Sequence, residues 1–387
     1  MLWLDEALSI GERVDVEVLR MKKGSLEGRT LTRDEVPEAP CPHIDSCGGC
    51  PWQRLDRKAQ LDALQRDIDH QLRGRTGEPL PWGDPWVSQR EDDLAWRHTA
   101  RFHWRDGQLG FYQRGSKTLT TIPSCLLLAA PLPALLSLLQ GLCQQLPGAG
   151  VLRLSAARDA ESGTITLQPE QRLGSDDLSA LVEALLSSPH CHGVSLIDGR
   201  GRRLTSWGRA ENQLSSAPHP AEAFMQAHQE GNEALIATVI EACDAEQGPL
   251  LDYYAGAGNF SLPLARRGHL VTAVELSSTA MRALQAQADF EGLPLTCRSS
   301  GDEQLPPGDF KQLVLDPPRA GAQRLIEALA EASPPSLRQI CYVSCHPATA
   351  VRDLKRLIEL GWSITTLRLF HLFPHSGHGE LFIQLRR

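Results

Sequence analysis

Residues 250–265, LLDYYAGAGNFSLPLA, run from an apolar segment typical of a buried strand, through a glycine turn, into a helix-like segment. The same alternation continues to the end of the chain, with strand-like segments at 248–254, 269–275, 311–316, 339–344 and 363–369 and helical stretches at 277–291 and 347–360. Alternating strands and helices indicate a parallel sheet with helices on both faces. With a glycine turn after the first strand, they predict a Rossmann-like α/β domain over residues 221–387.

The first 220 residues show a different pattern. Apolar residues recur there at helical spacing, at Leu61, Leu64, Ile68 and Leu72. Residues 99–112 and 163–167, in contrast, have the pattern of extended segments. This mixture predicts an α+β central domain over residues 40–220. Residues 1–39 contain one strand-like run, at 13–19, which is too little to form a core of its own.

Length and composition limit the class of protein. The chain has 387 residues, of which 41% are hydrophobic and 22% charged, enough for two or three compact domains. No segment approaches the roughly 18 consecutive apolar residues of a membrane span, and the acidic N-terminus does not resemble a secretory signal. We therefore expect a cytoplasmic protein in which the clustered cysteines among the ten bind metal or take part in catalysis.

Charge gives two opposing indications about a nucleic-acid partner. The net charge of −8 argues against one, because polyanions are held mainly through neutralised phosphates. Residues 94–117, however, interleave five cations with five aromatic residues: Arg97, Arg101, Arg105, Arg114 and Lys117 with Trp96, Phe102, Trp104, Phe111 and Tyr112. This mixture is typical of single-stranded RNA binding, but a β-hairpin with a solvated basic face and a packed aromatic face explains it equally well. Residues 200–209 form a weaker basic stretch.

The glycine turn indicates a class of cofactor. Gly256 and Gly258 let the backbone approach a ligand, and Glu275 closes the next predicted strand, where a carboxylate can bind ribose hydroxyls. A dinucleotide site requires a third glycine where Ser261 stands. Asp252, ahead of the turn, suits the positively charged methionine part of S-adenosylmethionine better than a pyrophosphate. An ordinary strand–helix turn without a ligand is the alternative.

Two further motifs follow predicted strands. In LVLDPPRAGA, residues 313–322, Asp316 ends the strand, and Arg319 stands where methyltransferases acting on exocyclic amines carry a base-stacking aromatic residue. In YVSCHPATAVRDLKRL, residues 342–357, Cys345 lies between a strand and a helix. The helix dipole is expected there to lower the thiol pKa and to favour the nucleophilic thiolate. A buried small side chain is the alternative role for a single cysteine at this place.

A nucleophilic cysteine at a strand end points to methylation of carbon 5 of uracil, which is too weak a nucleophile to react unaided. A thiolate that adds to carbon 6 creates an enolate, whose carbon 5 can attack a sulfonium methyl group. A base must then remove the proton from carbon 5 so that the cysteine can leave. Glu380 in FPHSGHGELFIQLRR, residues 373–387, is the candidate base, with His375 and His378 close by to tune or replace it.

In this order, the motifs resemble those of the RNA uracil-5-methyltransferase family: a DxxCGxGNF-type turn, a DPxRxG loop, an SCNP loop and a terminal FPHTxHxE segment. The resemblance covers most of residues 41–387. It implies a class I methyltransferase fold, with Cys345 as nucleophile and Glu380 as base. It also implies that S-adenosylmethionine contacts, beside Gly256 and Gly258 of the turn, Gln226, Tyr254, Asn259, Glu275, Asp302 and Asp316.

The resemblance extends to the clustered cysteines and the N-terminus. Cys41, Cys47, Cys50 and the distant Cys125 match the pattern that holds a 4Fe-4S cluster in many family members, which implies a structural cluster in the central domain. From spacing alone, tetrahedral zinc fits equally well. Residues 11–29 resemble only the latter half of a TRAM domain, a small RNA-binding β-barrel of OB type, so residues 1–39 are expected to be a truncated TRAM-like segment.

Two histidines depart from the family pattern. His346 stands beside Cys345 where the family usually has asparagine, and His228 replaces another common asparagine; both are expected to affect base recognition. The predicted function is methylation of a uridine in RNA by a monomer. Ribosomal RNA is favoured over transfer RNA, because cysteine-bearing central domains resemble that branch. Two alternatives stay open: the same chemistry on cytosine or another RNA, and a non-catalytic RNA-binding or assembly protein that retains the fold.

Overall fold

The computed structural model describes residues 2–4, 14–22, 25–33, 38–72, 79–146, 148–157, 160–173, 178–209, 211–213, 218–220, 225–246, 248–299 and 304–387. Contacts divide the chain into two compact units, each built from segments distant in sequence. Unit 1 comprises Met1–Ala63, Arg90–Ala227 and Phe373–Gly377, and unit 2 comprises Leu64–Gln89, His228–Leu372 and His378–Arg387. Among the described helices, none has the length and apolarity needed to cross a membrane.

A small sheet of three strands opens unit 1. β2 (Val14–Lys22) pairs antiparallel with β3 (Ser25–Arg33), whose other edge pairs in parallel with β1 (Leu2–Leu4). The sequence predicts only one strand here, because β3 lacks regular alternation and acquires its extended form by pairing along the whole of β2. The TRAM likeness of this segment stays a prediction.

The main sheet of unit 1 has, among the described residues, seven strands in the order β10-β9-β8-β7-β4-β5-β6. Its strands are β4 (Thr99–Arg105), β5 (Gln108–Tyr112), β6 (Leu119–Thr121), β7 (Ala149–Ala156), β8 (Gly163–Pro169), β9 (Cys191–Ile197) and β10 (Arg203–Gly208). A separate ribbon joins β11 (Glu211–Gln213) to β12 (Pro218–Pro220). The extended segments predicted at 99–112 and 163–167 are therefore confirmed.

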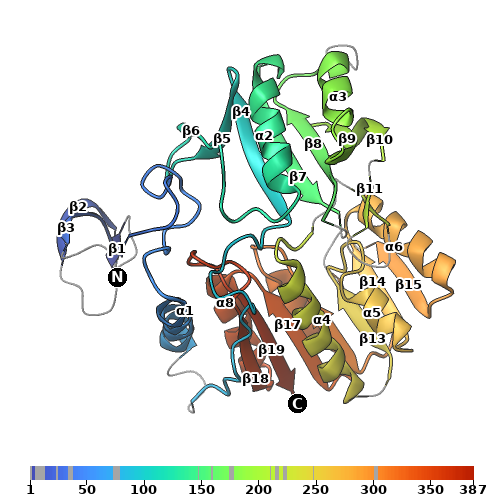
Figure 1. Ribbon diagram of the computed structural model, residues 1–387. Helices are drawn as coiled ribbons and strands as arrows, with labels where there is room; N and C mark the ends of the chain where they lie inside the picture. Colours follow the sequence, from blue (N-terminus) through green and yellow to red (C-terminus); the bar gives the residue numbers. More distant parts are fainter. Residues whose placement is uncertain are drawn as a thin grey trace. The chain divides into compact units, whose positions relative to one another are not determined.

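Helices cover one face of this main sheet (Figure 1). They are α2 (Leu132–Leu142), the short 3-10 helix η1 (Cys143–Gln145) and α3 (Ser179–Leu186). Phe102 and Trp104 of β4 are buried against leucines of α2, while Arg101 and Arg105, which flank them in sequence, are exposed. The strand alternates because successive side chains point to opposite faces of the sheet.

Helix α1 (Arg57–Leu72) confirms the helical spacing in the first half of the chain. Its leucine and isoleucine residues at positions 64, 68 and 72 are buried. The Asp56 carboxylate accepts the backbone N–H of Ala59 at 2.7 Å, a side-chain cap that starts the helix.

Unit 2 contains a second seven-stranded sheet within its described residues, in the order β15-β14-β13-β16-β17-β19-β18. The strands are β13 (Leu250–Tyr253), β14 (Val271–Glu275), β15 (Leu295–Ser299), β16 (Gln312–Leu315), β17 (Gln339–Ser344), β18 (Ser363–Phe370) and β19 (Glu380–Arg386). Five of them, from β15 to β17, run parallel, whereas β19 runs antiparallel between β17 and β18. The Rossmann-like sheet predicted from the alternation is present, with β15 as a strand that the prediction missed.

Helices flank the unit 2 sheet on both faces (Figure 1). They are α4 (Gln229–Asp244), α5 (Ser261–Arg266), α6 (Ser278–Glu291), α7 (Gln323–Ala332) and α8 (Pro347–Glu359). At the β18 edge, the backbone N–H groups of Gly83 and Trp86 donate to Leu367 and Leu369 at 2.9 and 2.8 Å. This segment satisfies backbone groups that an exposed edge strand would leave unpaired.

Candidate active site

Reactive side chains gather at one edge of the unit 2 sheet. Asp252 and Glu275 lie near or at the ends of β13 and β14, and Asp316 and Cys345 directly follow β16 and β17. Because parallel strands end at the same edge, four motifs that are far apart in sequence meet there.

Glu380 reaches this edge from the opposite direction, because β19 is antiparallel to β17 and its register pairs Ser344 with Leu381. Glu380 comes immediately before Leu381, and Cys345 immediately after Ser344, so the register places the carboxylate beside the thiol. The Glu380 carboxylate is fully buried and raises the pKa of the Cys345 thiol. The structure thus brings the two residues together, as their predicted roles require.

The pKa of Cys345 contradicts the expectation from the helix dipole. Burial, followed by the carboxylates of Glu380 and Asp316, raises the thiol pKa to about 11, and the guanidinium of Arg319 lowers it only in part. Cys345 also precedes the capping residue His346, outside the first turn of α8, where the effect of a helix dipole is strongest. The expected lowering of the thiol pKa is therefore wrong for the protein by itself.

The carboxylates of Asp252, Glu275 and Asp316 lie close together at this edge and are called the acidic group below. Burial, together with the carboxylates of Asp316 and Glu275, raises the pKa of Asp252 to about 7, against the lowering effect of Ser261. Burial likewise raises the pKa of Asp316 to about 7. One oxygen of Asp252 accepts the Ser261 hydroxyl, while the other makes no hydrogen bond within the described part of the chain. Such a group favours a cationic ligand, whose charge stabilises the ionised carboxylates.

The glycine turn after β13 is held by Glu275. Its two carboxylate oxygens accept the backbone N–H groups of Gly256 at 2.9 Å and Ser277 at 2.6 Å. Gly258 has φ +99°, and a Cβ at that position would lie 2.5 Å from the Leu284 side chain. Glycine is therefore required there both by its backbone conformation and by close packing against α6.

The predicted residue Asn259 and two residues that sequence reasoning missed, Asn232 and Ser261, support the same turn. Asn259 and Asn232 of α4 exchange side-chain amide hydrogen bonds of 2.9 and 3.1 Å, and Ser261 donates to Asp252. Asn232 carries no local signal, because only the packing of α4 brings it to the turn. Tyr254 lies in the turn with φ +69°, a left-handed conformation that is uncommon outside glycine.

Both unusual histidines are helix N-caps. The Nδ1 atom of His346 accepts the backbone N–H of Thr349 at 3.4 Å, and that of His228 accepts the N–H of Gly231 at 3.2 Å. Asparagine caps helices through its side-chain oxygen in the same way. The two replacements therefore keep the local role that asparagine would have at the start of α8 and α4.

The remaining predicted residues lie elsewhere or stay undescribed. Gln226 belongs to unit 1, and Asp302 is outside the described residues. His375 also belongs to unit 1, where its backbone N–H donates to Gln60 at 2.7 Å and burial lowers its pKa. His378 is exposed in unit 2.

The four cysteines predicted to bind metal lie near one another in unit 1. Burial raises the pKa of Cys47, of Cys125 and, to about 12, of Cys50, and the thiols raise one another's pKa values. Backbone N–H groups at Cys47 and Cys125 and the guanidinium of Arg97 act in the opposite direction. Across the described residues, however, no three His, Cys, Asp or Glu side chains stand close enough together to hold a metal ion as they are placed.

The basic stretch in unit 1 is the β4–β5 hairpin. Its aromatic residues mostly pack inward, and the rings of Phe102 and Phe111 stack at 4.4 Å. On the other face, Arg101 pairs across strands with Arg153 of β7, and His103 stacks on Tyr112 at 4.0 Å. The two explanations of this stretch are thus compatible, since a packed face and a basic face coexist on one hairpin.

Comparison with known proteins places the chain in a family. A family model described as tRNA (Uracil-5-)-methyltransferase matches residues 215–293 and 301–387. The 23S rRNA (uracil(1939)-C(5))-methyltransferase RlmD of Chromohalobacter salexigens is 31% identical over 416 residues, spanning 100% of this chain and 84% of the relative. The chain belongs to the RNA uracil-5-methyltransferase family. A second RlmD of the same description, from Shewanella amazonensis, is 30% identical, and the match covers 96% of this chain and 87% of that relative.

A solved structure shows the same fold for another protein with uracil-5-methyltransferase in its name. Pyrococcus abyssi tRNA (uracil-54, C5)-methyltransferase in complex with S-adenosyl-L-homocysteine matches with a TM-score of 0.72 at 20% identity. The match covers 97% of this chain and 92% of that one. This match shows a shared fold. The membership in the RNA uracil-5-methyltransferase family predicted from the motifs is confirmed by the relatives at 31% and 30% identity, and with it the prediction of an enzyme.

Proposed function

We propose that this chain methylates carbon 5 of a uridine in RNA, with S-adenosylmethionine as methyl donor and Cys345 as a transient covalent nucleophile. The observation that carries the proposal is the register of β17 and β19, which places Glu380 beside Cys345. The Asp316 carboxylate, at the same edge, also raises the pKa of the Cys345 thiol. Nucleophile, base and acidic group therefore occupy one place.

The chemistry follows from these positions. The Cys345 thiolate adds to carbon 6 of uracil, and the ring electrons move to carbon 5 and the neighbouring carbonyl oxygen. S-adenosylmethionine supplies an electrophilic methyl group to carbon 5. Glu380 then removes the proton from carbon 5, the double bond between carbons 5 and 6 re-forms, and the thiolate leaves. Arg319 favours the thiolate at both ends of this cycle, because its cation lowers the thiol pKa.

The acidic group fits S-adenosylmethionine by charge. Its methionine part carries a sulfonium and an ammonium, and Asp252 and Asp316 have pKa values of about 7 that a nearby cation would lower. Asp252 also has one oxygen without a hydrogen bond in the described part of the chain. Glu275, Tyr254, Gly256, Gly258 and Asn259 would contact the remaining parts of the ligand at the turn, and Gln226 and Asp302 complete the set implied by the motifs.

The substrate proposed is ribosomal RNA, because the relatives that span nearly the whole chain are named as 23S rRNA methyltransferases. Transfer RNA is the second candidate, supported by the description of the family model. In unit 1, the face of β4 with the exposed Arg101 and Arg105 and the stacked His103 and Tyr112 suits phosphates and unstacked bases. We also propose that the protein acts as a monomer in the cytoplasm.

We further propose that Cys41, Cys47, Cys50 and Cys125 hold a 4Fe-4S cluster. Four thiolates carry excess negative charge, and two features of this region compensate such charge. Backbone N–H groups donate toward the sulfurs of Cys47 and Cys125, and the Arg97 cation lies close by with a buried Nε that bonds to nothing within the described residues. Iron and labile sulfide analysis of protein purified without oxygen tests this, and zinc without iron would contradict it.

The catalytic proposal is tested with RNA that contains 5-fluorouridine. Fluorine at carbon 5 cannot be removed as a proton, so the cysteine adduct should persist after methyl transfer. A covalent protein–RNA complex that requires S-adenosylmethionine and disappears in Cys345→Ala is expected. Absence of the complex with both ribosomal and transfer RNA transcripts would favour the non-catalytic alternative, for which the two capping histidines supply no argument.

A further inference from the structure

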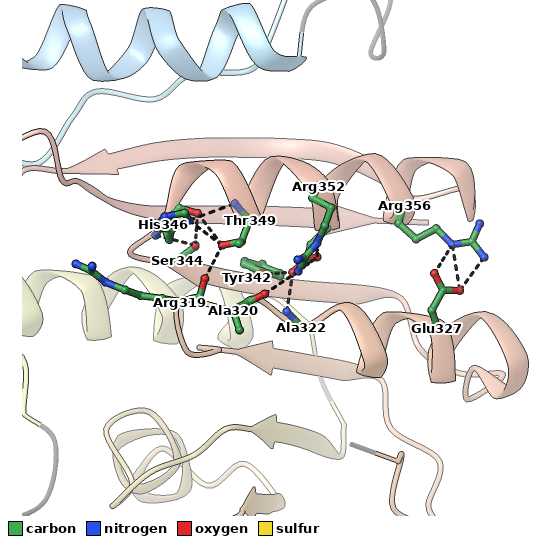
Figure 2. A network of polar contacts seen from close by, with 11 residues as sticks. Arg319, Ala320, Ala322, Glu327, Tyr342, Ser344, His346, Thr349, Arg352 and Arg356 are labelled. Carbon is green, nitrogen blue, oxygen red and sulfur yellow. Dashed lines mark hydrogen bonds and ion pairs between the residues drawn. The ribbon is translucent and has the colours of Figure 1, made fainter. Parts of the chain in front are cut away.

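Helix α8, which begins just after the nucleophile, also holds the loop that follows β16. Thr349 Oγ1 donates to the Arg319 carbonyl oxygen at 3.1 Å, and Arg352 Nη2 donates to the Ala320 carbonyl oxygen at 2.9 Å. Asp353 Oδ2 accepts the backbone N–H of Ala322 at 2.6 Å. Figure 2 shows Thr349 and Arg352 directed from α8 toward the loop. Thr349, Arg352 and Asp353, spaced for one helix face, are called the α8 clasp below.

Asp353 is the centre of the α8 clasp. Its carboxylate is buried, with 1% of the residue exposed, and it accepts the Tyr342 hydroxyl of β17 at 2.8 Å. Its other oxygen accepts two hydrogen bonds from Arg352, at 2.8 and 2.6 Å. One carboxylate therefore joins α8, β17 and the loop after β16. Removing the partners of a buried carboxylate strongly destabilises the folded protein, because the charge stays buried without hydrogen bonds.

Gly321 shows that the loop and the α8 clasp fit closely. A Cβ added to Gly321 would lie 2.5 Å from Asp353 Oδ2 and 3.2 Å from Thr349 Cβ, and its φ is +80°. Arg352 Nη2 lies closer still, so a side chain is excluded by all three members of the clasp as well as by the backbone conformation.

The same network continues to the residue beside the nucleophile. His346 Nδ1 lies 3.2 Å from Thr349 Oγ1, the hydroxyl that donates to Arg319 (Figure 2). His346 N–H also donates to Ser344 Oγ at 3.2 Å, which bridges the residues on either side of Cys345. A chain of contacts therefore runs from the loop that starts at Asp316 to the loop that carries Cys345.

We propose that Asp353 is a positioning residue that couples the cofactor-side carboxylate Asp316 to the nucleophile Cys345 through the α8 clasp. The inference rests on the proposed function and adds to it a residue that lies outside the reacting groups. Because the clasp contacts both loops, loosening it should impair ligand binding at Asp316 and attack by Cys345 together.

The test compares Asp353→Asn with Tyr342→Phe, which removes one partner of Asp353 but leaves its bond to the loop. Hydrogen exchange of peptides covering residues 316–322 reports the Ala322 N–H directly. Calorimetry reports S-adenosylhomocysteine affinity, and the 5-fluorouridine adduct reports attack by Cys345. Asp353→Asn should increase the exchange and weaken both affinity and adduct rate about tenfold, with Tyr342→Phe close to the unchanged protein.

A destabilised control separates positioning from general loss of stability. Leu357→Ala removes a fully buried side chain of the same helix and should lower the melting temperature without altering affinity or adduct rate. Thr349→Ser keeps the hydroxyl that donates to the Arg319 carbonyl oxygen, so the hydrogen exchange of residues 316–322 should stay close to that of the unchanged protein.

The outcomes distinguish the two proposals. Unchanged exchange in Asp353→Asn would overturn the α8 clasp, and increased exchange with normal affinity and adduct rate would overturn its positioning role. Failure of the unchanged protein to form any adduct would instead overturn the proposed function, while the exchange measurement would still decide whether the clasp exists.

Discussion

The strand-end edge of unit 2 and the four-cysteine region of unit 1 both bury ionisable groups beside one another, but they differ in how the groups are placed. At the edge, strand register sets Glu380 against Cys345. In unit 1, loops bring Cys41, Cys47 and Cys50 toward Cys125, and no set of three described side chains there has metal-binding spacing.

The two regions nevertheless share one electrostatic property. Burial raises the pKa of Cys345 and Asp252 at the edge, to about 11 and about 7, and that of Cys50 in unit 1, to about 12. A single arginine partly opposes the rise in each region, Arg319 in one and Arg97 in the other. A positively charged occupant would stabilise the ionised groups of both regions, a sulfonium in the proposed function and metal ions in the proposed cluster.

The largest expected effect is that of Cys345→Ala, which removes the nucleophile. Methylation should fall by a factor of about 10⁴ or more, because carbon 5 stays too weak a nucleophile without the thiolate bound at carbon 6. The measurement is tritium transfer from labelled S-adenosylmethionine to RNA. Cys297→Ala is the matched control, since burial also raises the pKa of this thiol, in unit 2, to about 11. Equal loss in both variants would show that the effect is not specific to the edge.

The second effect concerns the loops of unit 1. Cys50→Ser should abolish bound iron and lower the melting temperature by about 5 °C or more, because metal binding and folding are linked. Cys191→Ser, another unit 1 thiol whose pKa burial raises to about 11, should do neither. Iron content and thermal unfolding are measured together. A Cys50→Ser protein with unchanged iron would show that the four cysteines do not act as a set.

The third effect tests the buried acids through pH. The folded-state pKa of Asp252 lies above its ordinary value of 3.8, at about 7, so the native protein binds more protons than the unfolded chain between these values. The free energy of unfolding should therefore fall as pH rises from about 4 to about 7. Asp252→Asn abolishes this contribution, and its stability relative to the unchanged protein should improve by on the order of 1–3 kcal/mol between pH 5 and pH 8.

Urea unfolding without added ligand measures this difference. Asp244→Asn provides a control of opposite sign, since hydrogen bonds from His269 and Arg267 lower the pKa of Asp244. Its stabilising contribution is present above the unfolded pKa and is lost as pH falls. A pH-independent difference for Asp252→Asn would show that Asp252 is already ionised in the protein.

The smallest expected effect is on RNA affinity. Arg101→Ala should weaken RNA binding about threefold and reduce the slope of log K against log salt by about 1, because one phosphate contact is lost. Arg324→Ala, which removes an exposed arginine of α7, should change neither. Filter binding over a range of salt concentrations measures both. No change in the salt slope for Arg101→Ala would exclude this face of β4 from the RNA path.

Sequence reasoning correctly predicted which residues follow the strand ends, while their roles stay predictions. Glycines at 256 and 258, Asp316 and Cys345 each follow a hydrophobic strand, and a parallel sheet necessarily gathers such positions. It failed for Asn232 and Ser261, whose partners are contributed by another element or lie across the turn. It also failed for the pKa of Cys345, because burial and neighbouring carboxylates depend on packing that no local pattern reveals.

By itself, the amino-acid sequence determined the alternation of strands and helices, the reactive residue types and their order, since these depend on local hydrophobic period and covalent chemistry. Only the tertiary structure decided which residues touch. The antiparallel insertion of β19 brings Glu380 beside Cys345, and the buried Asp353 joins the loop after β16 to α8. Both depend on register and burial, which arise only when distant segments pack against each other.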